Sequence, residues 1–469
     1  MEFADSETKD DLVPEQRRTL RRAIAASAMG NATEWYDFGV YAYVASTMGA
    51  VFFPETDNPV VSLLTAYGVF AVSFLVRPLG GLVLGPIGDR IGRQRVLVVT
   101  ILMMAGSTFA IGLLPGYATI GIAAPILLIL CRLIQGFSTG GEYGGAATFM
   151  AEYSPDRRRG FFGSFLEFGT LCGVILSAGV VTVCTLALGD DGMRSWGWRI
   201  PFLLAGPLGL IGLYLRSKLE DTPVFKELVA EGKVEKQTGT QLRDLVKNWR
   251  PILICMGLVV MLNVADYTLV TYMPEYLKGP LRLSSNASLL LTIALYVAML
   301  CVIGSVGKLS DRVGRKPLWY FSGFGFLVLS IPAFLLMDHG WGFAVVGLIA
   351  LGLLLVLQLG TISATFPALF PTHIRYAGFA ISYNVATSLF GGTAPLINTA
   401  LIDATGDQLI PAYYMMAACV VGLIALWFAP ETARASLRGT EQPSTETDAQ
   451  PAAEIKDEGK DQPAAPAKS

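Results

Sequence analysis

Charged residues are scarce in this chain of 469 residues, where they make up only 15% of the sequence. A soluble domain usually carries about 25% charged residues. Hydrophobic residues account for 53% of the chain, and a soluble globule this apolar would expose large adhesive patches. A lipid bilayer is therefore the better solvent for it. The net charge is −2, and most charged residues lie in the two tails, a middle segment and a few short clusters. This distribution excludes a basic surface for nucleic acid along the chain.

Residues that bind metals or carry redox chemistry are also few. The chain has only His339 and His373, and none of its six cysteines is spaced as CxxC. All six lie in apolar stretches, which favours a role as small helix residues: Cys131, Cys172, Cys184, Cys255, Cys301 and Cys419. We therefore expect no metal and no cofactor. The absence of a GxxxxGK[ST] loop and of a GxSxG elbow disfavours an ATP-driven pump and an enzyme.

Long apolar stretches predict an all-α membrane protein. A helix that crosses about 30 Å of hydrocarbon needs about 20 largely apolar residues. Twelve stretches meet this need, near residues 24–52, 61–85, 96–115, 121–151, 161–188, 199–216, 251–277, 287–307, 317–336, 342–369, 377–403 and 411–429. The first is too long for a cleaved signal peptide. We expect a cytoplasmic N-terminal segment (1–22), two six-helix bundles (23–216 and 250–430), a cytoplasmic linker (217–249) and a disordered tail (431–469).

Lysine and arginine gather in alternate loops, which sets the expected orientation. The loops opposite hold little beyond Arg194, Lys278 and Arg282. The basic side, which also includes the linker, holds Arg17, Arg18, Arg21, Arg22, Arg90, Arg93, Arg95, Arg157, Arg158, Arg159, Lys308, Arg312, Arg315, Lys316 and Arg375. We therefore expect a multi-pass protein of the plasma (inner) membrane, with both termini in the cytoplasm.

The sequence repeats internally at one nearly constant offset. Residues 85–94 (GPIGDRIGRQ) match residues 307–316 (GKLSDRVGRK), 222 positions later. A second match, 218 positions apart, pairs Arg157, Gly160, Phe161 and Ser164 with Arg375, Gly378, Phe379 and Ser382. Each copy falls in the equivalent place of its half. This pattern predicts two related six-helix halves.

The paired GxxxDRxGR loops resemble the signature of the major facilitator superfamily. Four further strings are similar to its metabolite:proton symporter group: residues 34–41 (EWYDFGVY), 77–81 (RPLGG), 135–143 (QGFSTGGEY) and 198–202 (WRIPF). Three more are most similar to proline/glycine-betaine permeases: residues 271–274 (TYMP), 370–376 (FPTHIRY) and 411–415 (PAYYM). The resemblance covers roughly residues 20–435 and implies 12 transmembrane helices in two pseudo-symmetric bundles. The tail lacks the coiled coil of osmosensing members, so osmotic regulation is not implied.

Ionisable residues inside a span usually face a cavity or a partner. Glu34 and Asp37 are three residues apart and share a helix face. At 1.5 Å per residue, Asp37 and Arg132 reach similar depths in the first and fourth spans, so they can pair if those helices touch. We expect Asp37 to carry the coupled proton, with Glu34 or Glu142 as alternatives. The resemblance to related sugar porters, which use an aspartate in the first span and an arginine in the fourth in this way, implies the same role. The other interpretation is a fixed ion pair between the two helices.

Aromatic residues around those acids are candidates for substrate binding. Trp35, Tyr36 and Tyr41 can hold a quaternary ammonium group through cation–π contacts of about 0.5–2 kcal/mol. Arg132, with Gln135 on its face, can bind the carboxylate of the same solute. Packing or an interfacial belt is the alternative role for the aromatic residues. In the second half the candidates, which could equally hold helices together, are Asn263, Asp266, Tyr267, Gln358, Tyr383 and Asn384.

The repeated loops are candidate cytoplasmic gates. Each Asp can accept hydrogen bonds from a helix N-terminus or an arginine of the other half, and each glycine permits a tight turn. The candidates are Gly85, Asp89, Arg90, Gly92, Arg93, Asp311, Arg312, Gly314 and Arg315, together with Arg77 before Pro78. The alternative is that these charged residues only set the orientation of the chain in the membrane and have no gating role.

The sequence thus predicts proton-coupled symport of a compatible solute of the proline, glycine betaine or ectoine type by alternating access. The alternative is a proton symporter of a carboxylate such as 2-oxoglutarate, citrate or shikimate. The buried acids disfavour a passive channel. The expected partners are a small zwitterionic or carboxylate solute, protons and the lipid bilayer, and we expect a monomer.

Overall fold

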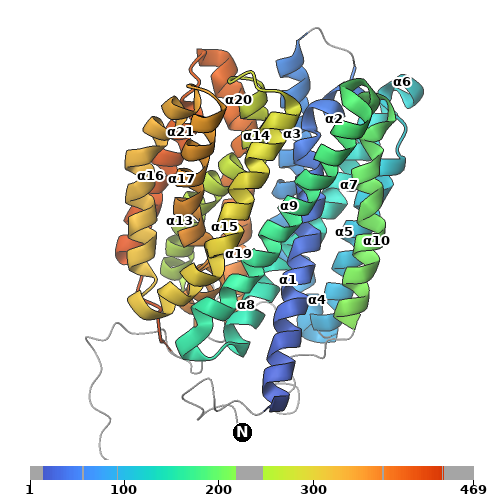
Figure 1. Cartoon of the computed structure of the whole chain (residues 1–469). Helices are drawn as coiled ribbons and strands as arrows, with labels where there is room; N and C mark the ends of the chain where they lie inside the picture. Colours follow the sequence, from blue (N-terminus) through green and yellow to red (C-terminus); the bar gives the residue numbers. More distant parts are fainter. Residues whose placement is uncertain are drawn as a thin grey trace, which may run out of the picture.

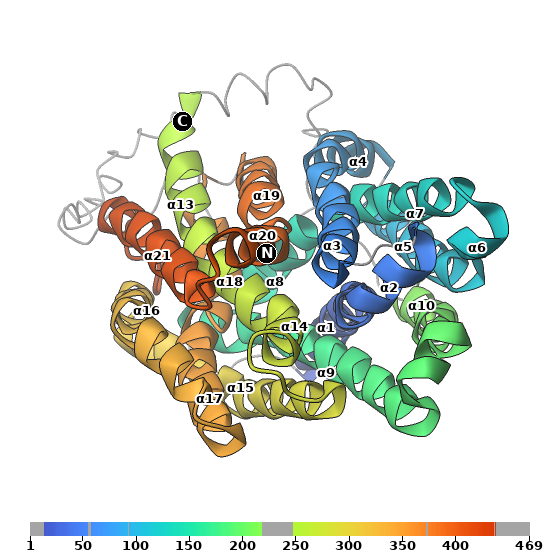
Figure 2. The ribbon, with the colours of Figure 1, turned by 90° about the horizontal axis from the view of Figure 1, so that it is seen from above.

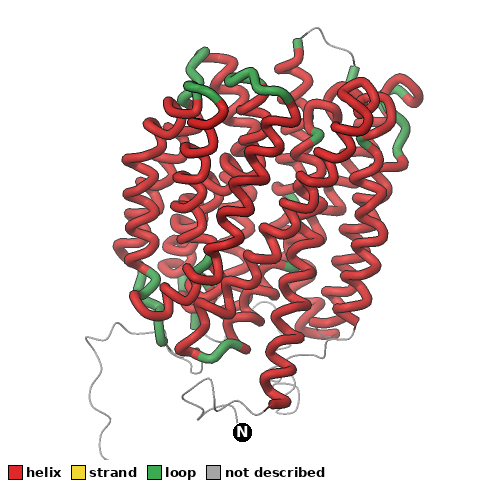
Figure 3. The backbone as a smooth tube through the Cα atoms, viewed as in Figure 1, coloured by secondary structure: helices red, strands yellow, loops and turns green. Residues whose placement is uncertain are grey.

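The computed structural model describes residues 14–54, 58–91, 93–217, 247–371, 374–435 and 437. Within these ranges the chain is almost entirely helical, and none of the described residues forms a strand (Figure 3). Most of the expected linker and tail lie outside the described residues, as does the expected N-terminal segment before Pro14. The proposed domain boundaries therefore stay a prediction.

The first half consists of six helical columns that run alternately up and down. Several columns are broken into two helices, where a turn or a short gap interrupts the hydrogen bonding. In order they are α1 (Pro14–Tyr43) with α2 (Ala45–Phe52), α3 (Pro59–Leu75) with α4 (Arg77–Ile91), α5 (Arg93–Leu113), α7 (Ala123–Gly140) with α8 (Tyr143–Tyr153), α9 (Arg159–Gly192) and α10 (Arg199–Ser217). The connections include α6 (Tyr117–Ile120), η2 (Asp156–Arg158) and the π-helical turn η3 (Met193–Gly197).

The second half repeats this plan. Its columns are α13 (Trp249–Asp266), η4 (Tyr267–Tyr272) and α14 (Met273–Lys278); α15 (Ser285–Val313); α16 (Lys316–Met337); α17 (Trp341–Leu359) with α18 (Ile362–Thr365); α19 (Arg375–Ala386), η6 (Thr387–Gly391) and α20 (Ala394–Thr405); and α21 (Ile410–Phe428). The short η5 (Pro367–Leu369) precedes α19. The two copies of the repeated loop join the second and third columns of each half. The predicted all-α architecture of twelve spans in two six-helix bundles is confirmed.

Composition and surface agree with a bilayer environment. Among the described residues, 9 helical stretches are long and apolar enough to cross a membrane, and Val98–Leu113 and Arg199–Tyr214 are shorter apolar helices. The first column carries Glu34 and Asp37 within it and a basic first part, which lowers its mean hydropathy. Large apolar side chains are exposed along many columns, for example Val183, Leu210, Val328 and Ile424. Lipid tails would cover such side chains.

The two halves lie side by side and meet along a long interface. Figure 1 shows α1 and α9 of the first half against α14 and α15 of the second, and Figure 2 shows the two groups of helices from above. Near the end where α1 begins, α9 and α15 approach at Gly160 and Gly307. A Cβ added to Gly160 would lie 2.5 Å from the carbonyl oxygen of Gly307. Only glycine permits this close contact between the halves.

Candidate functional site

An aromatic cluster fills the middle of the interface between the halves. The ring of Trp35 on α1 lies 5.8 Å from that of Tyr267, which begins η4 in the other half. Phe74 on α3 meets Tyr267 edge to face at 5.3 Å. A second contact across the interface stacks Tyr143 of α8 on Tyr383 of α19 at 4.4 Å. These contacts join Trp35 to Tyr267 and place Tyr383 at the same interface, and all three are predicted substrate-binding residues.

Buried charges of both signs adjoin this cluster. The guanidinium of Arg77 lies 4.1 Å above the ring of Phe74 and 4.6 Å above that of Phe38. Asp266, the residue before Tyr267, is 4% exposed, and its Oδ1 has no hydrogen-bond partner. A buried polar group of this kind normally has a partner. The interface therefore offers an aromatic surface, a cation and a carboxylate oxygen available to a ligand.

Asp37 is also buried and unpartnered, but it lies in the first half. Its side chain is 0% exposed, and neither carboxylate oxygen accepts a hydrogen bond. The ion pair with Arg132, which the sequence allowed if the two helices touch, is not formed in this structure. Arg132 instead donates to Gln135 at 2.8 Å and to Ser73 at 3.1 Å, and its guanidinium lies 4.3 Å above the ring of Tyr41. The rotation of α7 about its own axis directs Arg132 to these neighbours.

Three further acids are buried near the interface. Glu34 is 4% exposed and Glu142 2% exposed, Glu142 standing at the junction of α7 and α8. Glu167 on α9 is held more firmly. It accepts hydrogen bonds from Tyr143 at 2.6 Å and from Thr170 at 2.9 Å. The sequence prediction left Glu167 out of the coupling set.

Several predicted substrate-binding residues form hydrogen bonds that hold helices together. Tyr36 donates to the carbonyl of Pro201 at 2.8 Å, and Tyr41 donates to that of Ala66 at 3.0 Å, both within the first half. Gln358 donates to Ser322 at 2.8 Å within the second half. Two more bonds involve the interface side of the second half. Asn263 donates to Thr387 at 2.7 Å, and Asn384 donates across the interface to Gly140 at 2.9 Å.

The second copy of the repeated loop makes the contact that the sequence predicts. Asp311 accepts hydrogen bonds from the backbone N–H groups of Gly160 at 2.7 Å and Phe161 at 2.9 Å, which begin α9 in the other half. Gly314 has φ of 101°, a left-handed conformation that favours glycine, while Arg312 is exposed. In the first copy, Gly92 lies outside the described residues, as do the side-chain surroundings of Gly85, Asp89, Arg90 and Arg93.

A segment after α21 crosses this end of the molecule and binds arginines of both halves. Arg315 donates to Thr432, and its backbone N–H donates to Glu431 at 3.1 Å. Arg159 of the first half donates to the carbonyl of Ala435 at 2.9 Å. Burial, together with the nearby charge of Arg159, lowers the pKa of the Arg315 guanidinium to about 9. Residues 431–435, which the sequence predicts as part of the tail, therefore link the two halves, and their composition does not indicate this role.

The aromatic cluster has two further features that hydropathy did not indicate. One is Phe74, which the sequence presents as one apolar residue among many. The other is the pair of π-helical turns, η4 and η6, whose first residues are Tyr267 and Thr387. The two turns lie together, since a Cβ added to Gly391 in η6 would lie 2.9 Å from the Tyr267 ring. Such turns are frequent at functional sites.

Comparison with known families and proteins gives one consistent result. A family model described as Major Facilitator Superfamily matches residues 23–385. The chain is 47% identical to "Proline/betaine transporter" of Salmonella typhimurium over 434 residues, which cover 90% of this chain and 85% of that protein. It is 46% identical to "Glycine betaine/proline/ectoine/pipecolic acid transporter OusA" of Dickeya dadantii, with 92% and 87% covered. The "Ectoine/proline transporter ProP" of Corynebacterium glutamicum is 44% identical, with 97% and 92% covered.

Solved structures share the fold at low sequence identity. The proton:xylose symporter XylE bound to 6-bromo-6-deoxy-D-glucose matches with a TM-score of 0.72 and 18% identity, over 90% of this chain and 98% of that one. The inward-open conformation of XylE from E. coli matches with a TM-score of 0.65 at 18% identity, over 88% and 97% of the chains. At this identity the likeness concerns the fold alone.

Proposed function

The chain belongs to the major facilitator superfamily, and we propose that it carries a small zwitterion of the proline, glycine betaine or ectoine type into the cell with protons. It is a membrane transporter and not an enzyme, as the names of its relatives indicate. The relatives that transport such solutes are 44–47% identical to it over nearly the whole chain, which supports the substrate class. The two halves would expose the central site to each side of the membrane in turn.

The observation that carries the proposal is the composition of the interface between the halves. A quaternary or secondary ammonium group is attracted to aromatic faces such as those of Trp35 and Tyr267. Asp266 adds a carboxylate with an unpartnered oxygen beside them. We assign the solute's carboxylate to Arg77, which is buried next to Phe74, and not to Arg132, which already donates to Ser73 and Gln135 within the first half.

This composition favours a zwitterion over the alternative substrate, a plain carboxylate such as 2-oxoglutarate. A dicarboxylate would bring negative charge against Asp266 and would gain nothing from the aromatic faces. A zwitterion satisfies both signs of charge at once. Specificity arises here from repulsion of the wrong solute as much as from attraction of the right one.

Asp37 supports proton coupling because no hydrogen bond fixes its carboxylate. It can gain or lose a proton without breaking a bond that holds the fold, and a cation nearby can bias that exchange. Arg77 and Arg132 both lie over the ring of Phe38, the residue that follows Asp37. Rearrangement of Arg77 on solute binding would therefore reach the surroundings of Asp37. We place the protein in the plasma (inner) membrane as a monomer, with both termini cytoplasmic.

The direct test is uptake of labelled solute into vesicles that contain the purified protein, with and without an imposed pH gradient. We expect glycine betaine and proline to accumulate only when the outside is acidic, and 2-oxoglutarate to be excluded. Arg77→Gln should raise the KM for glycine betaine by about tenfold, the effect of losing one charge-assisted hydrogen bond. Accumulation of 2-oxoglutarate instead, or uptake that ignores a protonophore, would contradict the proposal.

A further inference from the structure

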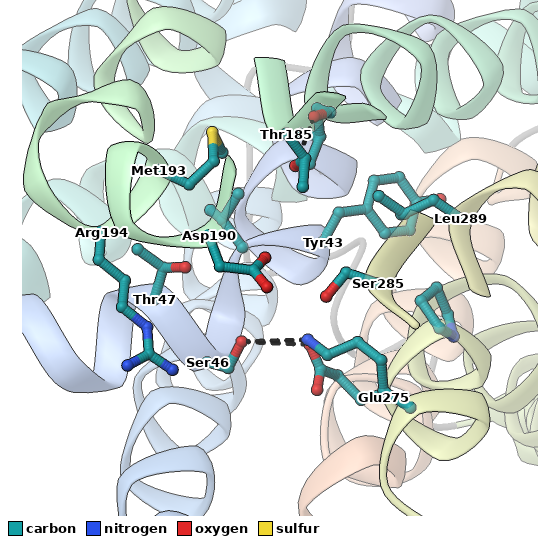
Figure 4. Close-up of a pocket in the computed structure, with 14 residues that line it drawn as sticks. Tyr43, Ser46, Thr47, Thr185, Asp190, Met193, Arg194, Glu275, Ser285 and Leu289 are labelled. Atoms are coloured by element: carbon teal, nitrogen blue, oxygen red, sulfur yellow. Dashed lines mark hydrogen bonds and ion pairs between the residues drawn. The ribbon is translucent and has the colours of Figure 1, made fainter. Parts of the chain in front are cut away.

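A polar cavity opens at the end of the molecule opposite the start of α1, between the two halves (Figure 4). Its volume is about 130 Å³. The first half contributes residues from the α1–α2 junction and from the end of α9 with η3. The second half contributes residues from α14 and the start of α15. The cavity is therefore part of the interface that alternating access must open and close.

Charges of both signs line this cavity from both halves. Asp190 and Arg194 come from the first half, and both are exposed. Neither forms an ion pair with another described residue. Glu275 and Lys278 come from the second half and lie 3.0 Å apart. Both also reach Ser46 across the interface, at 3.4 Å each. The cavity thus presents a free carboxylate and a free guanidinium opposite a bonded pair.

The floor of the cavity is a tyrosine seal between the halves. Tyr43 lines the cavity, and its hydroxyl lies 2.9 Å from that of Tyr296 on α15. Tyr296 in turn donates to the carbonyl of Val270 in η4, the turn that Tyr267 begins. Tyr43 and Trp35 are eight residues apart on α1, about 12 Å along the helix at 1.5 Å per residue. The seal therefore lies between the cavity and the central aromatic cluster.

We propose that this cavity is a second, outer binding site that holds the zwitterion before it reaches the central cluster. This inference rests on the proposed function and adds a second binding step to it. The solute's carboxylate would bind Arg194 and Lys278, and its ammonium group would lie between Asp190, Glu275 and the Tyr43 ring. Binding there competes with the Glu275–Lys278 pair and its bonds to Ser46. A bound solute therefore loosens the contacts that close the outer side.

The arrangement selects for a zwitterion in the same way as the central site. An anion alone would meet the carboxylates of Asp190 and Glu275, and a cation alone would meet Arg194 and Lys278. Only a solute that carries both charges a short distance apart can contact the carboxylates and the cations of the cavity at the same time. The two sites are therefore expected to share one substrate class, with the outer site the weaker because its charges are partly solvated.

Equilibrium dialysis of labelled glycine betaine against the purified full-length protein tests this directly. We expect the wild-type chain to bind a second molecule, which Asp190→Asn removes. The matched control is Asp191→Asn, because Asp191 is exposed, adjacent in sequence and outside the lining of the cavity. Asp190→Asn should also raise the KM for uptake by about tenfold, the loss of one charged contact, while Asp191→Asn leaves it unchanged.

The outcomes separate this inference from the proposed function. If Trp35→Ala removes all binding and Asp190→Asn removes none, the central site stands and the outer site is refuted. If the wild-type chain neither binds nor takes up glycine betaine, the proposed function itself fails. Arg194→Gln provides a second variant at an exposed position, where misfolding is not expected. If Asp190→Asn and Arg194→Gln both bind as many glycine betaine molecules per chain as the wild type does, the outer site is refuted.

Discussion

Asp37 and Glu167 are both buried acids, but their surroundings differ in a way that bears on coupling. Glu167 accepts two hydrogen bonds, from Tyr143 and Thr170, and would lose part of this support if it changed its protonation state. Asp37 accepts none, although it is fully buried. An acid that cycles must change charge without disturbing the fold. Among the buried acids, Asp37 fits this requirement best, and Glu167 fits a structural role.

Asp37→Asn should therefore separate solute movement from proton movement. The amide keeps the volume of the side chain but cannot titrate, so we expect loss of accumulation driven by a pH gradient. Exchange of labelled for unlabelled solute across the vesicle membrane needs no net proton transfer and should persist. The measurement is accumulation against exchange in the same vesicle preparation.

Glu34→Gln serves as the comparison for this prediction, because Glu34 lies on the same face of α1 one turn away. We expect it to lower accumulation less than Asp37→Asn does. Full accumulation by the Asp37 variant, with loss in the Glu34 variant, would transfer the coupling role to Glu34. Loss of both accumulation and exchange in the Asp37 variant would indicate a structural role.

At the scale of elements, glycines set how closely the helices of the first half can pack. A Cβ added to Gly136 on α7 would lie 1.7 Å from the carbonyl oxygen of Ser73 on α3, and one added to Gly140 would lie 1.9 Å from that of Arg77. The same stretch of α3 and α4 carries Phe74 and Arg77 to the central cluster. Close packing of α7 on α3 and α4 therefore positions the site.

Gly136→Ala should destabilise the protein because backbone cannot move aside as a flexible side chain can. Overpacking of this kind typically costs about 1–3 kcal/mol, and a direct backbone clash should reach the upper end. We expect a lower melting temperature of the purified protein in detergent. The control is Gly68→Ala on α3, where an added Cβ would meet nothing within 4 Å. Equal stability of the two variants would show that the helices separate at little cost.

The elements themselves were predictable, whereas their rotation about their own axes was not. Span length and the repeated loop are local signals, so the twelve columns and the two halves follow from the sequence. Depth along a span is also a local signal, and it predicts similar depths for Asp37 and Arg132. Which neighbour Arg132 faces depends on the packing of α7 against α3, and it faces Ser73. The pairing of Trp35 with Tyr267 likewise needs two helices from different halves.

The π-helical turns show a second limit of sequence reasoning. An extra residue in one helical turn leaves hydropathy almost unchanged, so nothing marked η4 or η6 in advance. The turns nevertheless decide where Tyr267 and Thr387 point. Residues such as Asn263 and Tyr267 share a face in a regular helix, which is why they were predicted together. In the structure Asn263 bonds to Thr387, while Tyr267 packs against Trp35 and Phe74.

At the scale of the whole molecule, both sides of the interface are closed by contacts of different strength. The end opposite the start of α1, which we propose is the outer side, depends on Tyr43, Ser46 and their partners, where two of the bonds are 3.4 Å long. The end where α1 begins, the proposed inner side, combines the glycine contact at Gly160, the bonds to Asp311 and the segment after α21 that joins Arg159 to Arg315. The inner closure crosses both halves at several points. Opening it should need the release of Asp311 from the start of α9.

Asp311→Asn should therefore shift the protein toward the state that is open to the cytoplasm. An asparagine can accept from Gly160 or Phe161, but it loses the charge, and hydrogen bonds to a charged group contribute about 1.5–3 kcal/mol each. We expect faster hydrogen exchange at the amides of Gly160 and Phe161, which now donate to the carboxylate. Turnover should fall, because the outer site can bind productively only while the inner side is closed.

Mass spectrometry of peptides covering residues 159–167 gives the exchange rate directly. Asp403→Asn is the control, since it removes the same charge from an exposed position on α20. Unchanged exchange in the Asp311 variant would mean that the loop sets topology and does not gate.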